Sequence, residues 1–308
     1  MKIRYGYNSK GDLSTVTDAA GNVTTYKYNK SHGLTEIKDP RGITPVKNEY
    51  DDSGRLVAHT DSYGKRIEYT HDIAGRQEVV KDRNGNLTVY IYDQKGRVLQ
   101  KTDPLGNVTS FAYDAVWNKL SETDALGNTT RWTYDDKKNI LTESKIVSGQ
   151  TITTSHTYNA LGKVLTTTDP LGHVATNTYD AKGNLLTTTD ALGNTTTNTY
   201  DSKGNLLTTT DALGNTTTYA YDASGRRISE TNAVGTIYNT YDASGNKASE
   251  TDRKGNTTLY TFNANGKLLT TENAIGSITR TEYDKVGNKI AEINPLGLIT
   301  WFYYDSAN

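Results

Sequence analysis

The 308-residue sequence lacks several features that most folded chains of this length have. It contains no cysteine, so neither disulfides nor thiolate metal sites stabilise it, and its redox compartment cannot be read from its composition. Hydrophobic residues make up only 34% of the chain, with one Met, three Phe and three Trp, which argues against a single thick core. No apolar run approaches the roughly 18–20 residues of a membrane-spanning helix.

Excess charge and targeting signals are missing as well. The net charge is −1 with acids and bases interspersed, so there is no basic stripe that would favour a nucleic acid as partner. The first residues, MKIRYGYNSKG, have no apolar segment of the kind found in a signal peptide. Met1 leads directly into repeat sequence, so we expect an excerpt of a longer protein.

What the chain does have is repetition. The segment Tyr179–Asp222 contains YDAKGNLLTTTDALGNTTTNT followed by YDSKGNLLTTTDALGNTTTYA, two copies that differ at three positions. Disorder is the other interpretation of low hydrophobicity, but 22 tyrosines in fixed register argue against it. Repetition this close predicts an array of identical structural units.

The Tyr of each Tyr-Asp pair serves as the anchor of one unit. Eleven of the fourteen intervals between anchors are 21 residues long, and the others are 22, 24 and 20. The 24-residue interval contains Ser144–Thr151, which we expect to form a longer, protruding loop. We therefore expect one array of about 14 units over residues 1–308. The anchors are Tyr7, Tyr28, Tyr50, His71, Tyr92, Tyr113, Tyr134, Tyr158, Tyr179, Tyr200, Tyr221, Tyr241, Phe262, Tyr283 and Tyr304.

Each unit carries two turn signals with the same chemistry. In the first turn, which follows the anchor and is called the YD turn here, and in the second turn about ten residues later, Asp stands first and Gly fourth, as in Asp211-Ala-Leu-Gly214. This pattern is typical of a type I turn in which Gly supplies a positive φ. We therefore expect positive φ at Gly193 and Gly214, and we expect the turn Asp to accept bonds from backbone amides.

Between the turns lie runs of about six or seven residues with strand character. Aromatic residues recur there with period two, as in Tyr90 and Tyr92, which places both on one face of a strand. In the alternate run the third residue after Gly is usually apolar, for example Leu186. These patterns predict an all-β fold of tandem 21-residue hairpins forming a long coiled antiparallel sheet, a hollow shell or barrel segment. About 28 strands at about 4.8 Å give a ribbon ~130 Å long.

With its Tyr-Asp anchors and the unit GNLLTTTDALGNTTTYAYD, essentially the whole chain resembles the Rhs/YD-repeat family. The resemblance implies a β-shell that, in bacterial polymorphic toxins and the B and C components of Tc toxins, encloses a C-terminal toxic domain; teneurins carry a related shell. The family's core segment, with its DPxGLxGG-like hallmark, closes the shell and cuts off the enclosed domain. The nearest match here, Asn294-Pro-Leu-Gly-Leu298, lacks the final glycines and fits one more second turn. We expect neither a core-protease nor a toxin domain in this segment.

No residue pattern points to catalysis, a cofactor or a metal. The repeated Asp residues form no calcium-loop motif, and the five histidines share no metal-ligand spacing. No G-x-S-x-G elbow surrounds a serine, and no carboxylate pair departs from the repeat. The functional residues are then the structural anchors themselves. These are Tyr92, Asp93, Tyr113, Asp114, Tyr179, Asp180, Tyr200, Asp201, Tyr221 and Asp222, with Gly193 and Gly214 in the second turns.

The function expected from these features is structural. The array would be a non-enzymatic segment of a secreted or cell-surface bacterial protein whose shell encapsulates a C-terminal toxin or effector domain, its main partner. The alternative is a cell-surface adhesion module that binds glycans or a partner protein through its Tyr- and Thr-rich face, with carbohydrate the weaker candidate. Unpaired edge strands also favour self-association.

Overall fold

The computed structural model describes residues 2–147 and 149–304, and every regular element in them is a β-strand. The strands are β1 (Arg4–Tyr7), β2 (Leu13–Thr17), β3 (Val23–Tyr28), β4 (Leu34–Lys38), β5 (Val46–Tyr50), β6 (Leu56–Thr60), β7 (Arg66–Asp72), β8 (Gln77–Lys81), β9 (Leu87–Tyr92), β10 (Val98–Thr102), β11 (Val108–Tyr113), β12 (Lys119–Thr123), β13 (Thr129–Tyr134), β14 (Ile140–Val147), β15 (Gln150–Tyr158), β16 (Val164–Thr168), β17 (Val174–Tyr179), β18 (Leu185–Thr189), β19 (Thr195–Tyr200), β20 (Leu206–Thr210), β21 (Thr216–Tyr221), β22 (Arg227–Asn232), β23 (Gly235–Tyr241), β24 (Lys247–Thr251), β25 (Thr257–Phe262), β26 (Leu268–Glu272), β27 (Ile278–Tyr283), β28 (Lys289–Ile293) and β29 (Ile299–Trp301).

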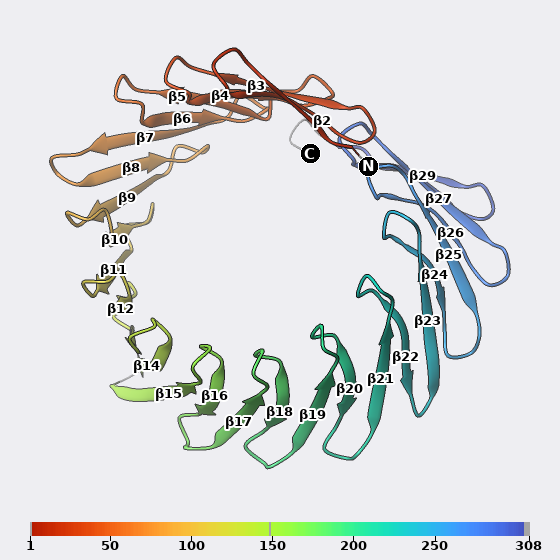
Figure 1. Cartoon of the computed structure of the whole chain (residues 1–308). Coiled ribbons are helices and arrows are strands. Elements are labelled where there is room, and N and C mark those ends of the chain that lie inside the picture. Colours follow the sequence, from red (N-terminus) through yellow and green to blue (C-terminus); the bar gives the residue numbers. More distant parts are fainter. Residues whose placement is uncertain (1, 148, 305–308) are drawn as a thin grey trace. The chain divides into compact units, whose positions relative to one another are not determined.

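These strands form one antiparallel sheet in which hairpin follows hairpin along the chain, as the run from β16 to β22 in Figure 1 shows. The prediction of an all-β fold of tandem hairpins is confirmed. Most strands have five or six residues, slightly fewer than the six or seven expected. By its internal contacts the chain groups into two compact units. Unit 1 contains residues 1–70, 79–87 and 237–308, and unit 2 contains residues 71–78 and 88–236.

The two hairpins of a repeat differ in register. Around a second turn the ladder is regular, for example Thr187↔Thr197 and Thr189↔Thr195 between β18 and β19. Around a YD turn the pairing shifts by one residue at the anchor, between Thr178 and Tyr179, so that an extra residue stands in the opposite strand. This β-bulge recurs beside most anchors and increases the local twist of the strands.

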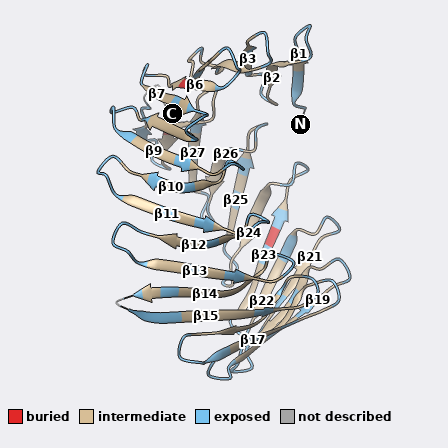
Figure 2. Cartoon of the chain, turned by 90° about the vertical axis from the view of Figure 1, so that its left-hand side faces the viewer, coloured by how far each residue is buried: buried red, intermediate tan, exposed pale blue. Residues whose placement is uncertain are grey.

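Very little of the sheet is buried. Among the described residues, the only buried apolar side chains are those of Ala58 and Ala291, and no large side chain is fully buried. The predicted apolar stripe is only partly buried, since Leu207 remains 37% exposed. Figure 2 shows mostly half-buried strands, with small buried segments near β6 and β23. The backbone ladders and turns therefore stabilise this fold more than hydrophobic packing does.

The prediction of a protruding loop at Ser144–Thr151 was wrong. β14 runs through Val147 and β15 begins at Gln150, and the two strands pair up to Val147↔Gln150. The physical reason is the β-branched content of the insertion, since Ile146, Val147 and Ile152 favour strand over loop. The extra residues lengthen a hairpin, and Ser148 lies outside the described residues.

Candidate functional site

The predicted Asp anchors each form a cap on their YD turn. In the turn Asp180–Gly183, the Gly183 amide donates to the Asp180 carbonyl at 3.0 Å. Asp180 Oδ1 accepts from the amides of Lys182 (2.8 Å) and Asn184 (2.9 Å), while Oδ2 accepts from the Asn184 side chain at 2.8 Å. One carboxylate thus satisfies two backbone donors and one side-chain donor, which confirms the expected bonding.

The other predicted Asp residues repeat this geometry. Asp114 and Asp201 are bonded by the Asn four residues later, and in Asp93 and Asp222 an Arg takes that place, with Nε at 2.6 Å from the carboxylate. Hydrogen bonds from the side chain and then the amide of Asn184 lower the pKa of Asp180, and Asn205 does the same for Asp201. These caps contribute all of their stabilisation at pH values above the usual carboxyl pKa. The stabilisation is lost as the pH falls through the lowered pKa of the folded state.

The glycines behave as predicted. Gly193 has φ of 87° and Gly214 has φ of 86°, both in the left-handed region, which confirms the assignment. A Cβ placed at either position would meet no atom within 4 Å. The need for Gly at these turns is therefore conformational rather than steric.

The Tyr anchors close the repeat through their hydroxyl groups. Tyr200 in β19 donates to the carbonyl of Leu185, the first residue of β18, at 2.9 Å, and Tyr179 donates to Val164 O at 3.0 Å. The ladder between β18 and β19 includes Thr187 but not Leu185. The Tyr200 hydroxyl therefore bonds a carbonyl that has no partner within this ladder. Four other anchors donate in the same way to a backbone carbonyl 15 to 18 residues earlier in the chain: Tyr50, Tyr134, Tyr158 and Tyr283.

The remaining predicted Tyr anchors have different surroundings. Tyr113 lies under the Arg97 guanidinium, 5.5 Å from its ring centre, which is a cation–π contact. Burial raises the pKa of Tyr221. Burial, and after it the negative charge of Glu78, raise the pKa of Tyr92. Tyr90 and Tyr92 lie on one face of β9 with ring centres 6.5 Å apart, as the period-two pattern predicts.

On the opposite face of the sheet, threonines pair across strands. Thr178 and Thr187 hydroxyls lie 2.6 Å apart, and Thr199 and Thr208 repeat the contact at 2.6 Å in the next unit. Thr178 and Thr199 are exposed, so this face meets water. Because the hydroxyls bond one another, the face is polar and yet keeps few unsatisfied groups.

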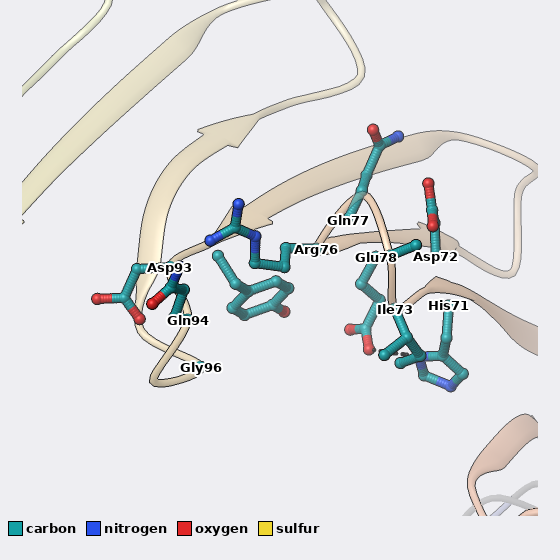
Figure 3. A pocket seen from close by; sticks show the side chains of 11 residues that line it. His71, Asp72, Ile73, Arg76, Gln77, Glu78, Asp93, Gln94 and Gly96 are labelled. Atoms are coloured by element: carbon teal, nitrogen blue, oxygen red, sulfur yellow. Dashed lines mark ion pairs between the residues drawn. The ribbon is translucent and has the colours of Figure 1, made fainter.

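A cavity that the repeat pattern does not predict lies beside the His71 anchor. It has a volume of about 550 Å³, lies in unit 2, and is lined by residues of 71–78 and 92–96. His71 stands in the anchor position, and its Nδ1 lies 2.9 Å from Glu78 Oε2; Figure 3 shows the two side chains facing each other, with Arg76 between them and Asp93. The turn is shifted, since Arg76 rather than Gly75 has positive φ (53°).

Polar side chains line this cavity beside an aromatic ring. Its lining offers the His71–Glu78 pair, the carboxylates of Asp72 and Asp93, the amides of Gln77 and Gln94, and the Tyr92 ring. Among the described residues, no group of three or more His, Cys, Asp and Glu side chains is arranged to hold a metal ion. Residues 2–147 and 149–304 contain no helix of the length and apolarity needed to cross a bilayer. The signal that marks the cavity in the sequence is His71 in place of Tyr, since Gly75 keeps the usual position four residues after the anchor.

Two further turns of unit 2 carry a bulky residue at the fourth position, where Gly is usual. Trp117 (φ 76°) and Lys138 (φ 69°) occupy the fourth position of consecutive YD turns in unit 2. Trp117 is 56% exposed and stacks under Arg97 at 5.6 Å, and the Lys138 ammonium donates to Val116 O at 3.0 Å. These contacts partly offset the backbone strain of the left-handed conformation.

Comparison with known proteins places this geometry in a family. The sequence profile described as RHS Repeat matches residues 7–44, 50–87, 92–116, 158–195, 179–212 and 200–237, more than half of the chain. Among curated proteins, no sequence matches at a significant level.

Solved structures show the same fold. A chain of the Photorhabdus luminescens Tc holotoxin pore, with a substituted TccC3 component, matches 99% of this chain with a TM-score of 0.75 and 16% identity. Crystal structures of TcdB2-TccC3-Cdc42 (94% of this chain, TM-score 0.64) and TcdB2-TccC3-TEV (95%, TM-score 0.63) match with 17% identity each. This chain spans only 19–20% of the length of those chains. The matched repeats and the hairpin fold agree, and the chain belongs to the RHS repeat family.

Proposed function

We propose that this array is a wall segment of a larger secreted protein, and that the wall encloses a C-terminal toxin or effector domain. The observation that carries the proposal is a sheet without a core that shares its fold, over 99% of its length, with a chain of a Tc holotoxin pore. A globular domain buries one face of each sheet, whereas a wall between a lumen and solvent keeps both faces wet.

The chemistry of the faces suits containment. One face carries threonine pairs that bond each other, as Thr178 does with Thr187, and the other carries half-buried Tyr and Leu side chains. A surface whose polar groups are already satisfied offers an enclosed polypeptide few new bonds. The wall would therefore hold a cargo domain without binding it tightly, and the array would have no catalytic role or cofactor of its own.

Protection from protease tests containment. A parent protein carrying this array and its C-terminal domain would be digested beside the isolated domain, with cleavage of the domain followed over time. We expect the enclosed domain to be cleaved at least tenfold more slowly, because a protease cannot cross a hydrogen-bonded sheet. Equal rates of cleavage would contradict containment, even if the array itself stayed intact.

The cavity beside His71 favours a second candidate function, adhesion to a glycan or a partner protein. Planar amides, a carboxylate and an aromatic ring are the groups that contact sugars in binding sites. Replacing His71 with Tyr restores the repeat and should abolish retention on a glycan array if adhesion uses this cavity. Retention that persists in His71→Tyr would rule out the cavity as the adhesive site.

A further inference from the structure

The second turns of unit 2 present a row of exposed apolar side chains. Each is the third residue of its turn, and each is 79–88% exposed, although large apolar residues usually avoid such exposure. Because one repeat contains two strands, neighbouring members are about 10 Å apart along the sheet edge, except that the β14–β15 hairpin separates Leu126 from Leu171. We call this row the leucine rim; it consists of Leu105, Leu126, Leu171, Leu192, Leu213 and Val234.

The opposite edge of the same unit carries a row of lysines. The third residue of several YD turns is Lys, and each Lys ammonium donates to a carbonyl of the following YD turn, as Lys203 does to Ala223 O at 3.1 Å and Lys182 to Ser202 O. An ammonium has three donors, so further acceptors can be bonded. We call this edge the lysine rim; it consists of Lys95, Lys137, Lys182 and Lys203.

Unit 1 shows what packs on a second turn. The Asn265 amide, third residue of a YD turn, donates to Asp18 Oδ2, first residue of a second turn, at 2.9 Å. One repeat further on, Arg41 of the next second turn lies 3.8 Å from Asp284 of the next YD turn. Successive second turns thus meet successive YD turns, in register, and Asp18 Oδ2 accepts Asn265 while keeping its bond from Asn22.

The covered and uncovered turns differ in composition. Where unit 1 covers its own second turns, the third position holds Ala20 and Arg41. Where the second turns of unit 2 are uncovered, that position holds Leu or Val. Apolar residues placed where water would be their only neighbour indicate a surface that becomes buried in an assembly.

We propose that the leucine rim of one copy of this chain packs against the lysine rim of a second copy. By the arrangement in unit 1, Lys182 and Lys203 of the second copy would reach the turn carboxylates Asp190 and Asp211. The leucines are longer than Ala20, which stays exposed in unit 1, and would therefore be buried against the YD turns. Contact between a Lys of one copy and a turn Asp of the other favours this pairing over contact between two leucine rims, where only turn carboxylates would meet. The interface joins unlike edges, so it is heterologous and can add copies in series. It does not depend on containment.

Sedimentation velocity over a range of concentrations tests whether this association occurs. We expect the native chain to form dimers and longer species, and Leu192→Asn with Leu213→Asn to weaken association roughly tenfold or more. Asn84 already occupies the equivalent turn position, so the change suits the turn. Val174→Thr, at an apolar residue that is 44% exposed on β17, is the matched control and should associate like the native chain. A native chain that stays monomeric at high concentration would overturn the proposal.

Cysteine cross-linking tests which edges meet. Because the chain has no cysteine, Leu192→Cys in one preparation and Lys203→Cys in another give unambiguous disulfides under mild oxidation. We expect disulfide dimers when the two variants are mixed and far fewer in either preparation alone. Cross-linking of Leu192→Cys alone at the level of the mixture would show leucine rims facing each other and would overturn the pairing.

Discussion

At the scale of the residue, the two ends of each turn have different physical roles. Asp at the first position accepts three hydrogen bonds, and Gly at the fourth position adopts a φ that other residues reach at a cost. At Asp190–Gly193 nothing surrounds the glycine within 4 Å. The contribution of Gly193 can therefore be measured without steric interference.

Replacing Gly193 with Val should destabilise its turn by about 1–2 kcal/mol, because a β-branched residue tolerates φ of 87° poorly. Gly193→Asn is the matched control and should cost less, since Asn adopts this region more readily. Chemical denaturation gives the change, and hydrogen exchange should show it confined to neighbouring repeats. Loss of protection throughout the chain would contradict an array of locally stabilised units.

The reverse change is predicted at Lys138, which holds φ of 69° where other turns have Gly. Lys138→Gly relieves the strain of the left-handed backbone conformation. It also raises the conformational entropy of the unfolded chain and removes the hydrogen bond to Val116 O, and both effects oppose the gain. We expect a net stabilisation of about 0.5 kcal/mol, measured by denaturation. A loss of more than about 1 kcal/mol would mean that the lysine contact outweighs the strain.

Removing the hydroxyl of an anchor Tyr tests how much its hydrogen bond stabilises the repeat. Tyr200→Phe removes the donor to Leu185 O and leaves that carbonyl in a half-buried place. We expect a cost of about 1 kcal/mol by denaturation. Tyr238→Phe, at a side chain that is 57% exposed, is the control and should be close to neutral. Equal effects at both positions would show that the hydroxyl bond to Leu185 does not stabilise the repeat.

At the scale of the element, the hairpin depends on the charged form of its turn aspartates. The Asn194 side chain and then its amide lower the pKa of Asp190 from the ordinary 3.8, and Asn215 lowers that of Asp211 in the same way. A lowered pKa in the folded state means that stability is constant at neutral pH and falls once the pH drops below the ordinary carboxyl range.

Thermal unfolding as a function of pH checks this dependence. We expect the midpoint to be flat from pH 7 to about 5 and to fall steeply below about pH 4. Asp190→Asn with Asp211→Asn should reduce the slope, because Asn accepts the same amide bonds without titrating, as Asn273 does for Ile275 and Ser277. An unchanged slope in that variant would assign the acid sensitivity to other groups.

Much of the hairpin could be predicted from the sequence because its determinants are local. Asp and Gly at fixed spacing predict the turn at Asp211–Gly214, and period two predicts the shared face of Tyr90 and Tyr92. Features that involve partners far along the chain could not be predicted. The carbonyl that Tyr200 bonds lies one strand away in a neighbouring ladder, and the contact of Asn265 with Asp18 spans 247 residues.

Other features could not be predicted because they lie where the chain departs from the repeat. The insertion at 144–151 was assigned to a loop although Ile146 and Val147 favour strand, and they extend β14. His71 stands at an anchor position, and its pairing with Glu78 beside a cavity could not be predicted from the repeat. In an array the regular units predict the fold, and the irregular residues mark where the local structure departs from it.

At the scale of the whole molecule, the account rests on a sheet that has no thick core. Only Ala58 and Ala291 are buried apolar residues among those described, and 29 strands lie in the one sheet. A compact globule of 308 residues has a radius of gyration of about 19 Å, because its chain packs around a core. A wall one sheet thick holds the same mass farther from its centre.

Small-angle X-ray scattering in dilute solution, extrapolated to zero concentration so that self-association does not contribute, measures this difference directly. The account predicts a radius of gyration well above about 19 Å, together with a pair-distance distribution that lacks the single symmetric peak of a compact globule. A radius of gyration at about 19 Å with such a symmetric peak would contradict the wall and, with it, the proposal that the chain encloses another domain.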